Sequence, residues 1–510
     1  MASASTLRDT PTFSVLPCSG SGLALVDASP VVGNHDANPL EALIPRAVLD
    51  HAVNTYFKYL FGLVPVVHRP TFMSDVAARR EELPGQEEWT ALVLAIVGVA
   101  MSQVPWDFVT MSKSDLRDMV QKCFDRVKAF VFEDFATPTT TRCVLLYLTA
   151  IMATRLGHRG IREICLGANW GLIFKMRIHD ESSYIGIGAI EAEIRRRIFW
   201  LALGFDKSAH AVHGTAPHTT REHCATVGLP TAIDDDFLTD DGYAPMPAGA
   251  NTSILSGFRY VSRLYGLFGH ILDMRRLDQH HTPSGDALKM RLIEVEELFE
   301  QMTDLMAGCP EELRLREHGH GVSSALDWAE QSYEDIRLLF EHPNSRTVVA
   351  DSFLVQQANI YTTMHMTRLL TLRYRADLRT LRAREFHHQL GGVGFFSTSS
   401  GVAATATREE PLLDEEADRT AAELLELLKT IPLQVLAVNG DAVVNKVRFV
   451  AVTQLEALER LTNQANVTSP SSEQDTRRLQ VAQDHLFNFL RILTEIETLF
   501  SFTNEPLQTS

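Results

Sequence analysis

Apolar side chains recur at helical spacing along almost the whole chain from about residue 41 onward, and no other feature constrains the fold as strongly. Between residues 116 and 131 they form an unbroken stripe with a period of about 3.6 residues, which indicates the buried face of an α-helix. The same period recurs at residues 49–60, 161–172, 190–205, 254–272, 288–305, 353–372, 424–428 and 486–500. Residues 143–153 are apolar on nearly every face, which predicts a central helix.

Signals for β-strands are almost missing. No run of β-branched residues alternates with polar residues between turn residues. Glycine and proline gather at residues 214–247, 283–285 and 391–401, which with residues 463–474 are the predicted loops. The sequence therefore predicts an all-α fold, a large array of about a dozen helices with no significant sheet.

Changes in pattern divide the chain into four predicted segments. Residues 1–40 are rich in Ser, Gly, Pro and Asp without a period, which predicts a disordered leader. Residues 41–390 hold most of the helical stripes and form the predicted main domain. An acidic flexible linker is expected at residues 391–418, and residues 419–510 are expected to add helices that pack on the main domain.

Composition excludes several classes of protein. The net charge of −17 opposes binding of nucleic acid by bulk electrostatics. Six cysteines in 510 residues are too sparse for a disulfide scaffold and fit a reducing compartment. The longest apolar stretches run about eleven residues, short of the roughly 18 that a membrane helix needs, and the N-terminus lacks the pattern of a signal peptide. We therefore expect a soluble intracellular protein.

An acidic run between residues 234 and 241 contains Asp234, Asp235, Asp236, Asp240 and Asp241. Because Mg²⁺ prefers several carboxylate oxygens, one hypothesis is an α-helical enzyme that holds Mg²⁺ and a diphosphate here. The paired-carboxylate motif of terpene-synthase-like enzymes is incomplete, since Thr239 stands where a third aspartate is required. The alternative, a solvated acidic loop, is the interpretation that we favour.

A second group of metal-binding residue types comprises His210, His213, His218, His223 and Cys224. Imidazole and thiolate are the ligands that zinc prefers, but this spacing matches no known zinc finger. Gly214 and Pro217 indicate a loop, so we expect a solvent-facing segment that gains positive charge on acidification. The common catalytic motifs for serine hydrolases, P-loop and dinucleotide-binding proteins and zinc proteases are missing. We predict no catalytic, cofactor-binding or metal-ligating residue, and no enzyme.

Three further segments allow two interpretations each. Residues 368–385 hold six arginines against two acidic residues, which suggests either a nuclear-import or nucleic-acid patch or a helix end with solvated arginines. Residues 409–418 resemble an acidic–hydrophobic activation segment, and ordinary linker acidity explains them equally well. The Met and aromatic residues at 254–306 line either a small-effector pocket or a plain core.

Two stretches are more specific than any of these motifs. One joins Tyr56 and Phe57 to the turn PVVHRPTF at residues 65–72, and the other is the helix EIRRRIFW at residues 193–200, which continues to Asp206. The second stretch is followed by Gly214, Pro217, Leu229-Pro230 and Asp234-Asp235. In order and spacing they resemble the middle homology region of fungal zinc-cluster transcription factors, clearly over residues 45–240 and by helical pattern to about 390. Residues 176–180 resemble the family's helix-ending segment, with Arg177 where glycine is usual.

The residue types in these stretches favour a structural role. The pairs Glu191–Arg195 and Glu193–Arg197 have the favourable i,i+4 orientation, worth about 0.2–0.5 kcal/mol each. Thr71 is a predicted cap for the helix that follows it. The two ring nitrogens of His68 suit a tie between a turn and neighbouring carbonyl groups. The signature therefore marks a fold rather than an active site.

The resemblance implies a transcriptional regulator in the nucleus, pathway-specific for a secondary-metabolite or catabolic gene set. The family's zinc-cluster module needs six cysteines, whereas Cys18 alone precedes residue 45 and no Cys-x-x-Cys pair occurs. We therefore expect that the chain lacks this module, either as a naturally shortened regulator or because the coding sequence has lost its first exon. Expected partners are other transcription proteins, DNA through a partner, a possible small-molecule effector and a second copy, but no membrane.

Overall fold

The computed structural model describes residues 38–105, 111–224, 226–246, 252–315, 346–391, 400–467, 473–500 and 502. Most of the leader predicted at residues 1–40 therefore lies outside the described residues. For residues 38–40 the expected disorder is wrong. Leu40 is buried, and the side-chain amide of Asn38 donates a hydrogen bond of 3.0 Å to Oε1 of Glu81.

Helices make up most of the described chain. The first half contains α1 (Arg46–Thr55), the π-helical turn η1 (Tyr56–Leu60), α2 (Arg69–Ala77), η2 (Arg80–Glu82), α3 (Glu87–Gln103), α4 (Lys113–Glu133), α5 (Thr140–Arg155), α6 (Arg159–Lys175), η4 (Glu181–Tyr184), α7 (Ala189–His213) and α8 (Arg221–Cys224). The second half contains η5 (Asp235–Phe237), β1 (Leu238–Thr239), β2 (Gly242–Tyr243), α9 (Ser256–His280), α10 (Gly285–Ala307), η6 (Glu311–Leu313), α12 (Arg346–Gly391), α13 (Ser400–Thr430), α14 (Leu433–Val438), α15 (Asp441–Val467) and α16 (Glu473–Phe500).

The predicted all-α fold is confirmed. In the described ranges the only strands are β1 and β2, which pair antiparallel with Leu238 opposite Tyr243. The apolar stripes found in the sequence coincide with helices, although the stripe at 254–272 begins two residues before α9 and the stripe at 49–60 continues from α1 into η1. None of the helices in the described ranges combines the length and apolarity needed to cross a membrane.

Local signals set several helix ends. Thr139 caps α5, where its hydroxyl accepts a hydrogen bond of 3.0 Å from the backbone N–H of Arg142. The end of α6 is closed by a pair of backbone hydrogen bonds, from Arg177 to the Phe174 carbonyl and from Ile178 to the Ile173 carbonyl. This closure requires the left-handed region, and Arg177 adopts it with φ of 56°. The family's usual glycine would do so without strain.

Two clusters of buried apolar side chains hold the helices together. The larger joins α1 to α7 with α13 to α16 and contains Phe124, Leu146 and Val447. The smaller lies among α9, α10 and α12, and it takes up several of the Met and aromatic residues at 254–306 as core, including Phe268 and Met302, whereas Met290 is exposed. These side chains therefore pack as a plain core, which is one of the two interpretations given for this segment.

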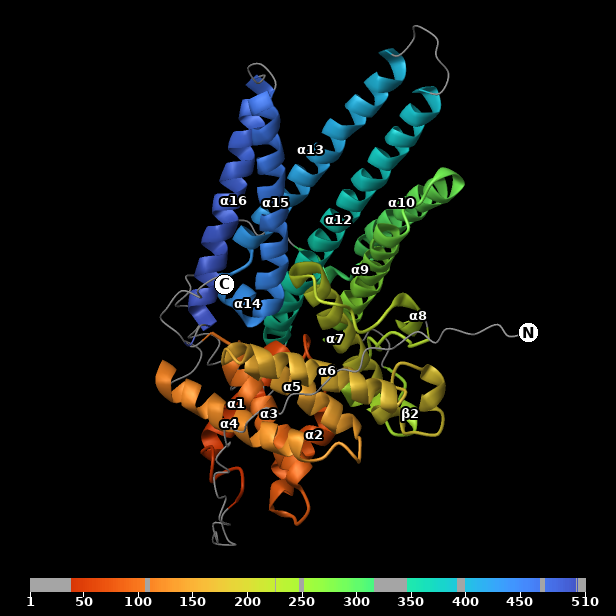
Figure 1. Ribbon diagram of the computed structural model, residues 1–510. Helices are drawn as coiled ribbons and strands as arrows, with labels where there is room; N and C mark the ends of the chain where they lie inside the picture. Colours follow the sequence, from red (N-terminus) through yellow and green to blue (C-terminus); the bar gives the residue numbers. More distant parts are fainter. Residues whose placement is uncertain are drawn as a thin grey trace, which may run out of the picture. The chain divides into compact units, whose positions relative to one another are not determined.

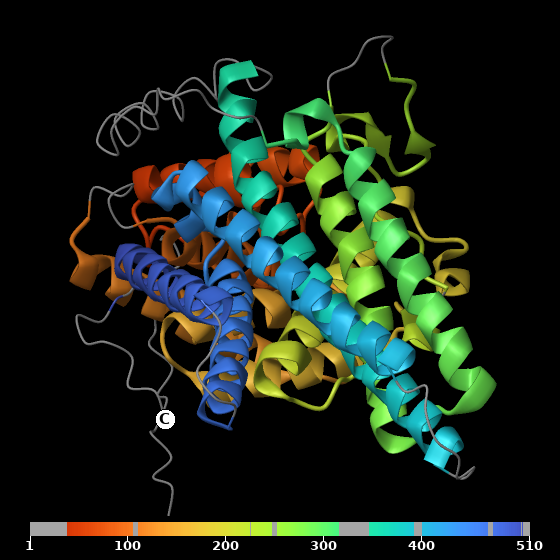
Figure 2. The same cartoon turned by 90° about the horizontal axis from the view of Figure 1, so that it is seen from above.

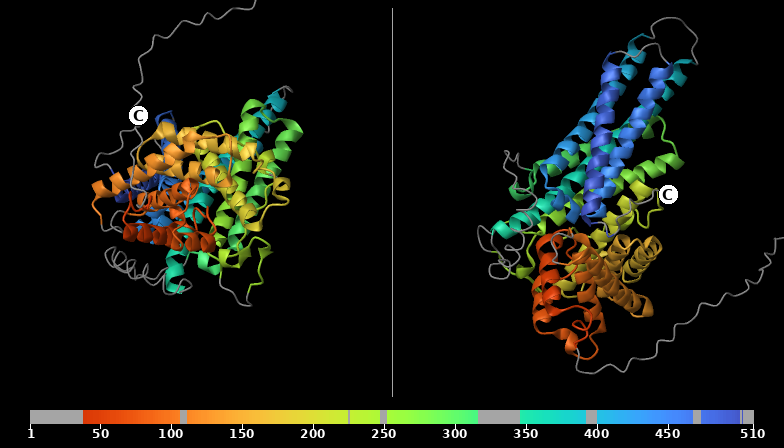
Figure 3. Two further views of the ribbon diagram at one scale, coloured as in Figure 1. Left: turned by 90° about the horizontal axis from the view of Figure 1, so that it is seen from below. Right: turned by 90° about the vertical axis from the view of Figure 1, so that its left-hand side faces the viewer.

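The long helices of the second half run beside one another. Figure 1 shows α12 next to α13 and α15 next to α16. In Figure 2, α9 and α10 lie on one side of α12, and the hairpin of α15 and α16 lies on the other. Both views of Figure 3 show α1, α3, α4 and α5 gathered together.

The linker expected at residues 391–418 is wrong for the part that the structure describes. Residues 400–418 belong to α13, and residues 392–399 lie outside the described residues. Toward its end α13 buries Leu424 and Leu428 against the larger core, and Glu416 forms an ion pair with Arg375 of α12. The acidic composition of residues 391–418 suggested a linker. It did not reveal the packing partners of α13, because these are distant in sequence. The division of the chain into domains stays a prediction.

Candidate functional site

The two signature stretches meet at Arg197, in the middle of α7. Its side chain is fully buried, and its Nη2 lies 2.6 Å from Oδ1 of Asp235 while its Nε lies 3.3 Å from Oε1 of Glu193. Glu193 is also fully buried. The predicted i,i+4 pair is therefore part of a buried ion network, an environment to which the range quoted for helix surface pairs does not apply. Helical periodicity placed the pair correctly but did not show which side faces the core.

Asp235 joins this network to the start of α2. Its Oδ2 accepts a hydrogen bond of 2.8 Å from the backbone N–H of Arg69, and its carbonyl oxygen lies 2.9 Å from Nε2 of His68. Because a carbonyl oxygen only accepts, Nε2 of His68 donates, and in the neutral ring Nδ1 accepts from the Thr71 hydroxyl at 2.7 Å. The prediction that His68 ties a turn to a carbonyl group is confirmed. Thr71 bonds this ring, and residue 68 is the N-cap of α2, so the predicted capping role of Thr71 is wrong.

A second set of contacts fixes the Leu-Pro loop against α7. The indole N–H of Trp200 donates a hydrogen bond of 2.9 Å to the carbonyl of Gly228, and the backbone N–H of Gly228 donates one of 2.9 Å to Oε2 of Glu181. Glu181 also accepts from Nε of Arg196 at 2.8 Å, and Thr231 donates its backbone N–H to Glu193 at 2.8 Å. Each landmark of the second stretch thus holds a loop on α7.

The charges of the network keep Arg197 ionised. Burial alone would lower the pKa of Arg197, but the nearby carboxylates of Asp235 and Glu193 outweigh it and raise the pKa above its ordinary value. Asp234 differs, because burial raises its pKa even though it accepts hydrogen bonds from the hydroxyl of Ser253 and the backbone N–H of Ile254. These carboxylates hold the protein together rather than face a reactant.

The acidic run divides into exposed aspartates (Asp236, Asp240 and Asp241), as the solvated-loop interpretation predicts, and two that are held by other elements. Asp235 is buried against Arg197, Asp234 is bound to the start of α9 through Ser253, and Asp240 accepts the backbone N–H of Ala189 on its carbonyl oxygen. Among the described residues no group of three His, Cys, Asp or Glu side chains is arranged to hold a metal ion. The solvated-loop interpretation is wrong for Asp234 and Asp235, because burial follows from contacts with α2 and α7 that the local sequence does not reveal.

The histidines that follow the second stretch divide between a helix and a loop. His210 and His213 end α7, so a loop is wrong for that half of the segment, and Gly214 terminates the helix with φ of 66°. Nδ1 of His218 lies 2.8 Å from Oδ1 of Asp206, which also accepts the backbone N–H of His218 at 2.9 Å. The Cys224 side chain lies outside the described residues. The described histidines are not brought together as a ligand set.

Asp206 and its neighbour Lys207 also hold a loop on α7, a role that no sequence motif predicted. Lys207 is buried, and its Nζ donates to the carbonyl of Thr219 at 2.6 Å and lies 3.2 Å from Oδ1 of Asp273. Together Asp206 and Lys207 pin residues 218 and 219 to α7. The sequence did carry a signal for this role: the two charged residues directly follow Phe205, the last residue of the apolar stripe, which is partly buried.

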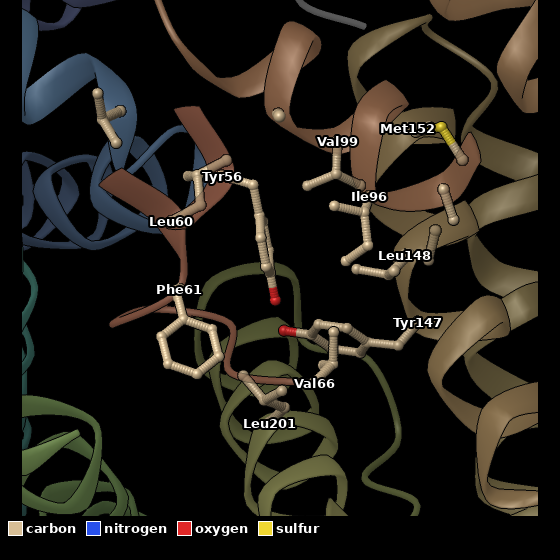
Figure 4. Close-up of a cluster of buried hydrophobic side chains, with 14 of the residues drawn as sticks. Tyr56, Leu60, Phe61, Val66, Ile96, Val99, Tyr147, Leu148, Met152 and Leu201 are labelled. Atoms are coloured by element: carbon tan, nitrogen blue, oxygen red, sulfur yellow. The ribbon is translucent and has the colours of Figure 1, made fainter. Parts of the chain in front are cut away.

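The aromatic pair of the first stretch lies at the heart of the larger core. Tyr56 donates its hydroxyl to the carbonyl of Val64 at 2.6 Å, and the Tyr56 and Phe57 rings pack edge to face with centroids 5.0 Å apart. Figure 4 shows the hydroxyl groups of Tyr56 and Tyr147 directed toward one another among aliphatic side chains. Burial raises the pKa of both hydroxyl groups. The π-helical turn that carries this pair was not predicted, since a π turn has no simple sequence signature.

The arginines at residues 368–385 lie inside α12 and are largely neutralised within the chain. Arg375 is buried between two acids, with Nη1 3.0 Å from Oε2 of Glu296 on α10 and Nη2 2.6 Å from Oε2 of Glu416 on α13. Other pairs are Arg368 with Glu423, Arg373 with Glu456 and Arg379 with Glu296. A helix end with solvated arginines is therefore wrong for these four residues, and they are not a free nucleic-acid patch. Glu416 belongs to residues 409–418, the segment that resembles an acidic–hydrophobic activation segment, and its carboxylate forms an ion pair with Arg375 within the fold.

Fold and site together define a class of protein: an all-α scaffold whose signature residues lock loops onto a central helix. Residues 53–304 match the fungal specific transcription factor domain. Over these residues, just under half of the chain, the resemblance predicted from the ordered signature is confirmed.

Several curated relatives resemble the chain. The transcriptional activator protein acu-15 of Neurospora crassa is 23% identical over 274 residues, which cover 53% of this chain and 28% of that protein. The Zn(2)-C6 fungal-type transcription factor pigI of Monascus ruber is 26% identical over 326 residues, covering 59% and 37%. The transcription factor macR of Penicillium terrestre is 21% identical over 300 residues, covering 54% and 34%. The chain thus spans about a third of the length of these relatives, and no solved structure matches it.

Proposed function

We propose that this protein is a transcriptional regulator that acts in the nucleus on a pathway-specific set of genes. The match of residues 53–304 to the fungal specific transcription factor domain carries the proposal. The relatives are named as transcription factors or activators, and one of them, aurR2 of Gibberella zeae, is named for the aurofusarin cluster. By analogy we propose that the target is a metabolic gene set, with a secondary-metabolite cluster as the first candidate.

The described residues support a scaffold that positions other proteins rather than one that reads bases. The chain carries a net charge of −17, which gives it no general attraction to DNA, and the arginines on α12 that pair with acids are not available to phosphates. We propose that contact with DNA is indirect, through a partner protein or a DNA-binding module outside these 510 residues. We propose also that the domain performs no catalysis, because its buried carboxylates are occupied by structural partners.

A tethering experiment tests this proposal. The chain is fused to a heterologous DNA-binding domain upstream of a reporter gene, and in parallel its own gene is deleted and all transcripts are measured. We expect the fusion to change reporter expression and the deletion to change one coherent gene set. If the reporter and every transcript stay unchanged, the proposal fails.

Two matched variants connect the readout to the scaffold. Arg197→Ala disrupts the buried network and is expected to reduce the reporter signal, whereas Arg195→Ala alters a half-exposed pair on the same helix and should leave it intact. A fluorescent fusion reports whether the chain enters the nucleus. Adding Mg²⁺ should leave the melting temperature unchanged, since ligand binding to the folded state would raise it.

A further inference from the structure

The outer face of the hairpin formed by α9 and α10 carries an exposed apolar patch. Leu277 on α9 and Met290 and Ile293 on α10 are exposed to 52%, 64% and 51%. Nε2 of His270 on α9 lies 3.1 Å from Oε1 of Glu294 on α10, and this pair fixes the register of the two helices. Leu277 follows His270 by seven residues, so it shares the face of α9 that the pair marks. Met290 precedes Glu294 by four residues, and Ile293 is its neighbour at i+3.

The outward face of α10 continues from this patch as a row of acids. Glu297, Glu300 and Asp304 follow Ile293 at steps of four, three and four residues, the spacing of a coiled-coil seam. All three are exposed, and none forms an ion pair among the described residues. Figure 2 shows α10 at the outer edge of this group of helices, with α9 and α12 on its inner side. Patch and acids together form the outer strip: Leu277, Met290, Ile293, Glu297, Glu300 and Asp304.

The acids of the outer strip are unfavourable where they stand. Glu300 and Asp304 are like charges at i,i+4, an arrangement that destabilises a helix. Asp304 also lies in the last turn of α10, where the helix dipole disfavours a carboxylate. Their neighbour Glu296 differs, because it pairs with Arg375 and Arg379 of α12. Cationic side chains of a partner would relieve both unfavourable terms of the outer row.

We propose that the outer strip binds a basic amphipathic helix of a partner protein. Apolar side chains of that helix pack on the exposed patch, because a contiguous apolar group marks an interaction site. Its Lys or Arg side chains, one to three turns along the same face, pair with the row of acids.

The charge pattern of the outer strip selects this occupant over a second copy of the chain. In a parallel pair of α10 helices the acids would lie opposite acids, and in an antiparallel pair the apolar end of each would lie opposite the acidic end of the other. Neither arrangement is complementary to itself, as an isologous interface must be. The proposal goes beyond the regulatory function and does not depend on it, since it concerns this surface alone.

Fluorescence anisotropy of labelled helical peptides on the 510-residue chain tests the proposal. Two basic peptides, about 20 residues long, carry leucines at two seam positions and arginines at three, in opposite orders along the peptide. Acidic versions have glutamates in place of the arginines, and polar versions have serines in place of the leucines. We expect one basic peptide to bind at least about tenfold more tightly than its acidic and polar versions. Equal binding of all versions overturns the proposal.

Two triple variants with the same change of net charge separate the outer strip from the general acidity of the chain. One reverses the row of acids, and the other reverses three exposed acids of α15 and α16: Glu297→Lys/Glu300→Lys/Asp304→Lys and Glu459→Lys/Asp484→Lys/Glu495→Lys. The first should prefer the acidic peptide, and the second should keep the preference of the wild type. Circular dichroism confirms that both are folded. If both prefer the same peptide, the proposal is wrong.

The apolar end of the outer strip has its own control. Ile293→Ser should weaken binding of the basic peptide, whereas Phe487→Ser, which removes a side chain on α16 that is 72% exposed, should not. Equal effects of the two substitutions would count against the patch. A photo-crosslinking amino acid at position 293, introduced into the chain in living cells, then identifies the occupant. We expect crosslinks to a Lys- or Arg-rich segment of another protein, and crosslinks to a second copy, to an acidic segment or to nothing overturn the proposal.

Discussion

Replacing Arg197 with alanine removes the cation that lies between two buried carboxylates. Glu193 has 0% and Asp235 has 3% of its surface exposed, so neither is solvated once the guanidinium is gone. Breaking a buried ion pair by removing one partner costs about 3–5 kcal/mol of unfolding free energy, because the remaining charge stays out of water without a partner. Nη1 of Arg196 lies 3.3 Å from Oε2 of Glu193 and offsets part of this loss. We therefore expect the lower end of the range, about 3 kcal/mol.

Urea denaturation followed by circular dichroism and by tryptophan fluorescence measures this loss, since Trp200 lies on the same helix. The matched control is Arg195→Ala, which breaks an i,i+4 pair with a Nε–Oε1 distance of 3.0 Å to Glu191, a carboxylate that is 42% exposed. Its expected cost is about 0.2–1 kcal/mol. In the double variant Arg197→Ala/Asp235→Ala the two losses should not add, because both remove one interaction. Equal small losses for Arg197→Ala and Arg195→Ala would refute the claim that burial sets the energy of the network.

Three further predictions concern strain and a buried amine. Arg177→Gly should raise the free energy of unfolding by about 0.5–1 kcal/mol, because φ of 56° strains a residue with a β-carbon. Gly157, with φ of 81°, ends α5 with the same pair of backbone hydrogen bonds, so Gly157→Ala should lower the free energy of unfolding. Equal denaturation midpoints for the wild type and both variants would contradict this. Gly440→Ala should lower the thermal midpoint, since its β-carbon would lie 2.3 Å from Oε1 of Gln103 on α3, and an unchanged midpoint would show that the contact is absent in solution. Burial lowers the pKa of Lys446 to about 7, so between pH 7 and 10.5 the unfolded chain binds a proton that the folded chain does not, and stability rises with pH across this window. Lys446→Met should flatten that rise in urea midpoints, and identical pH profiles for the variant and the wild type would disprove the assignment.

Most of the helical architecture was predictable because its signals are local. Apolar spacing located helices such as α4 and α5. The failures came where distant partners decide the outcome. Residues 400–418 look like a linker by composition, yet they are helical and Glu416 pairs with Arg375, 41 residues away.

The site shows the same division. Its residues were recognisable as an ordered signature, and the role of His68 followed from its two ring nitrogens. Whether each charge is buried was not recognisable. Glu191–Arg195 and Glu193–Arg197 have identical spacing, but only the second is enclosed, because Asp235 and the start of α2 cover that side of α7.

Sequence patterns alone thus settled the helical class and the order of the landmarks, since each depends on residues within a turn or two of one another. Tertiary structure decided which charges form a buried network, which arginines are neutralised and that Arg177 takes a left-handed conformation. The physical reason is that desolvation and ion pairing depend on neighbours that are distant in sequence, since Asp235 is 38 positions from Arg197 and 166 positions from Arg69.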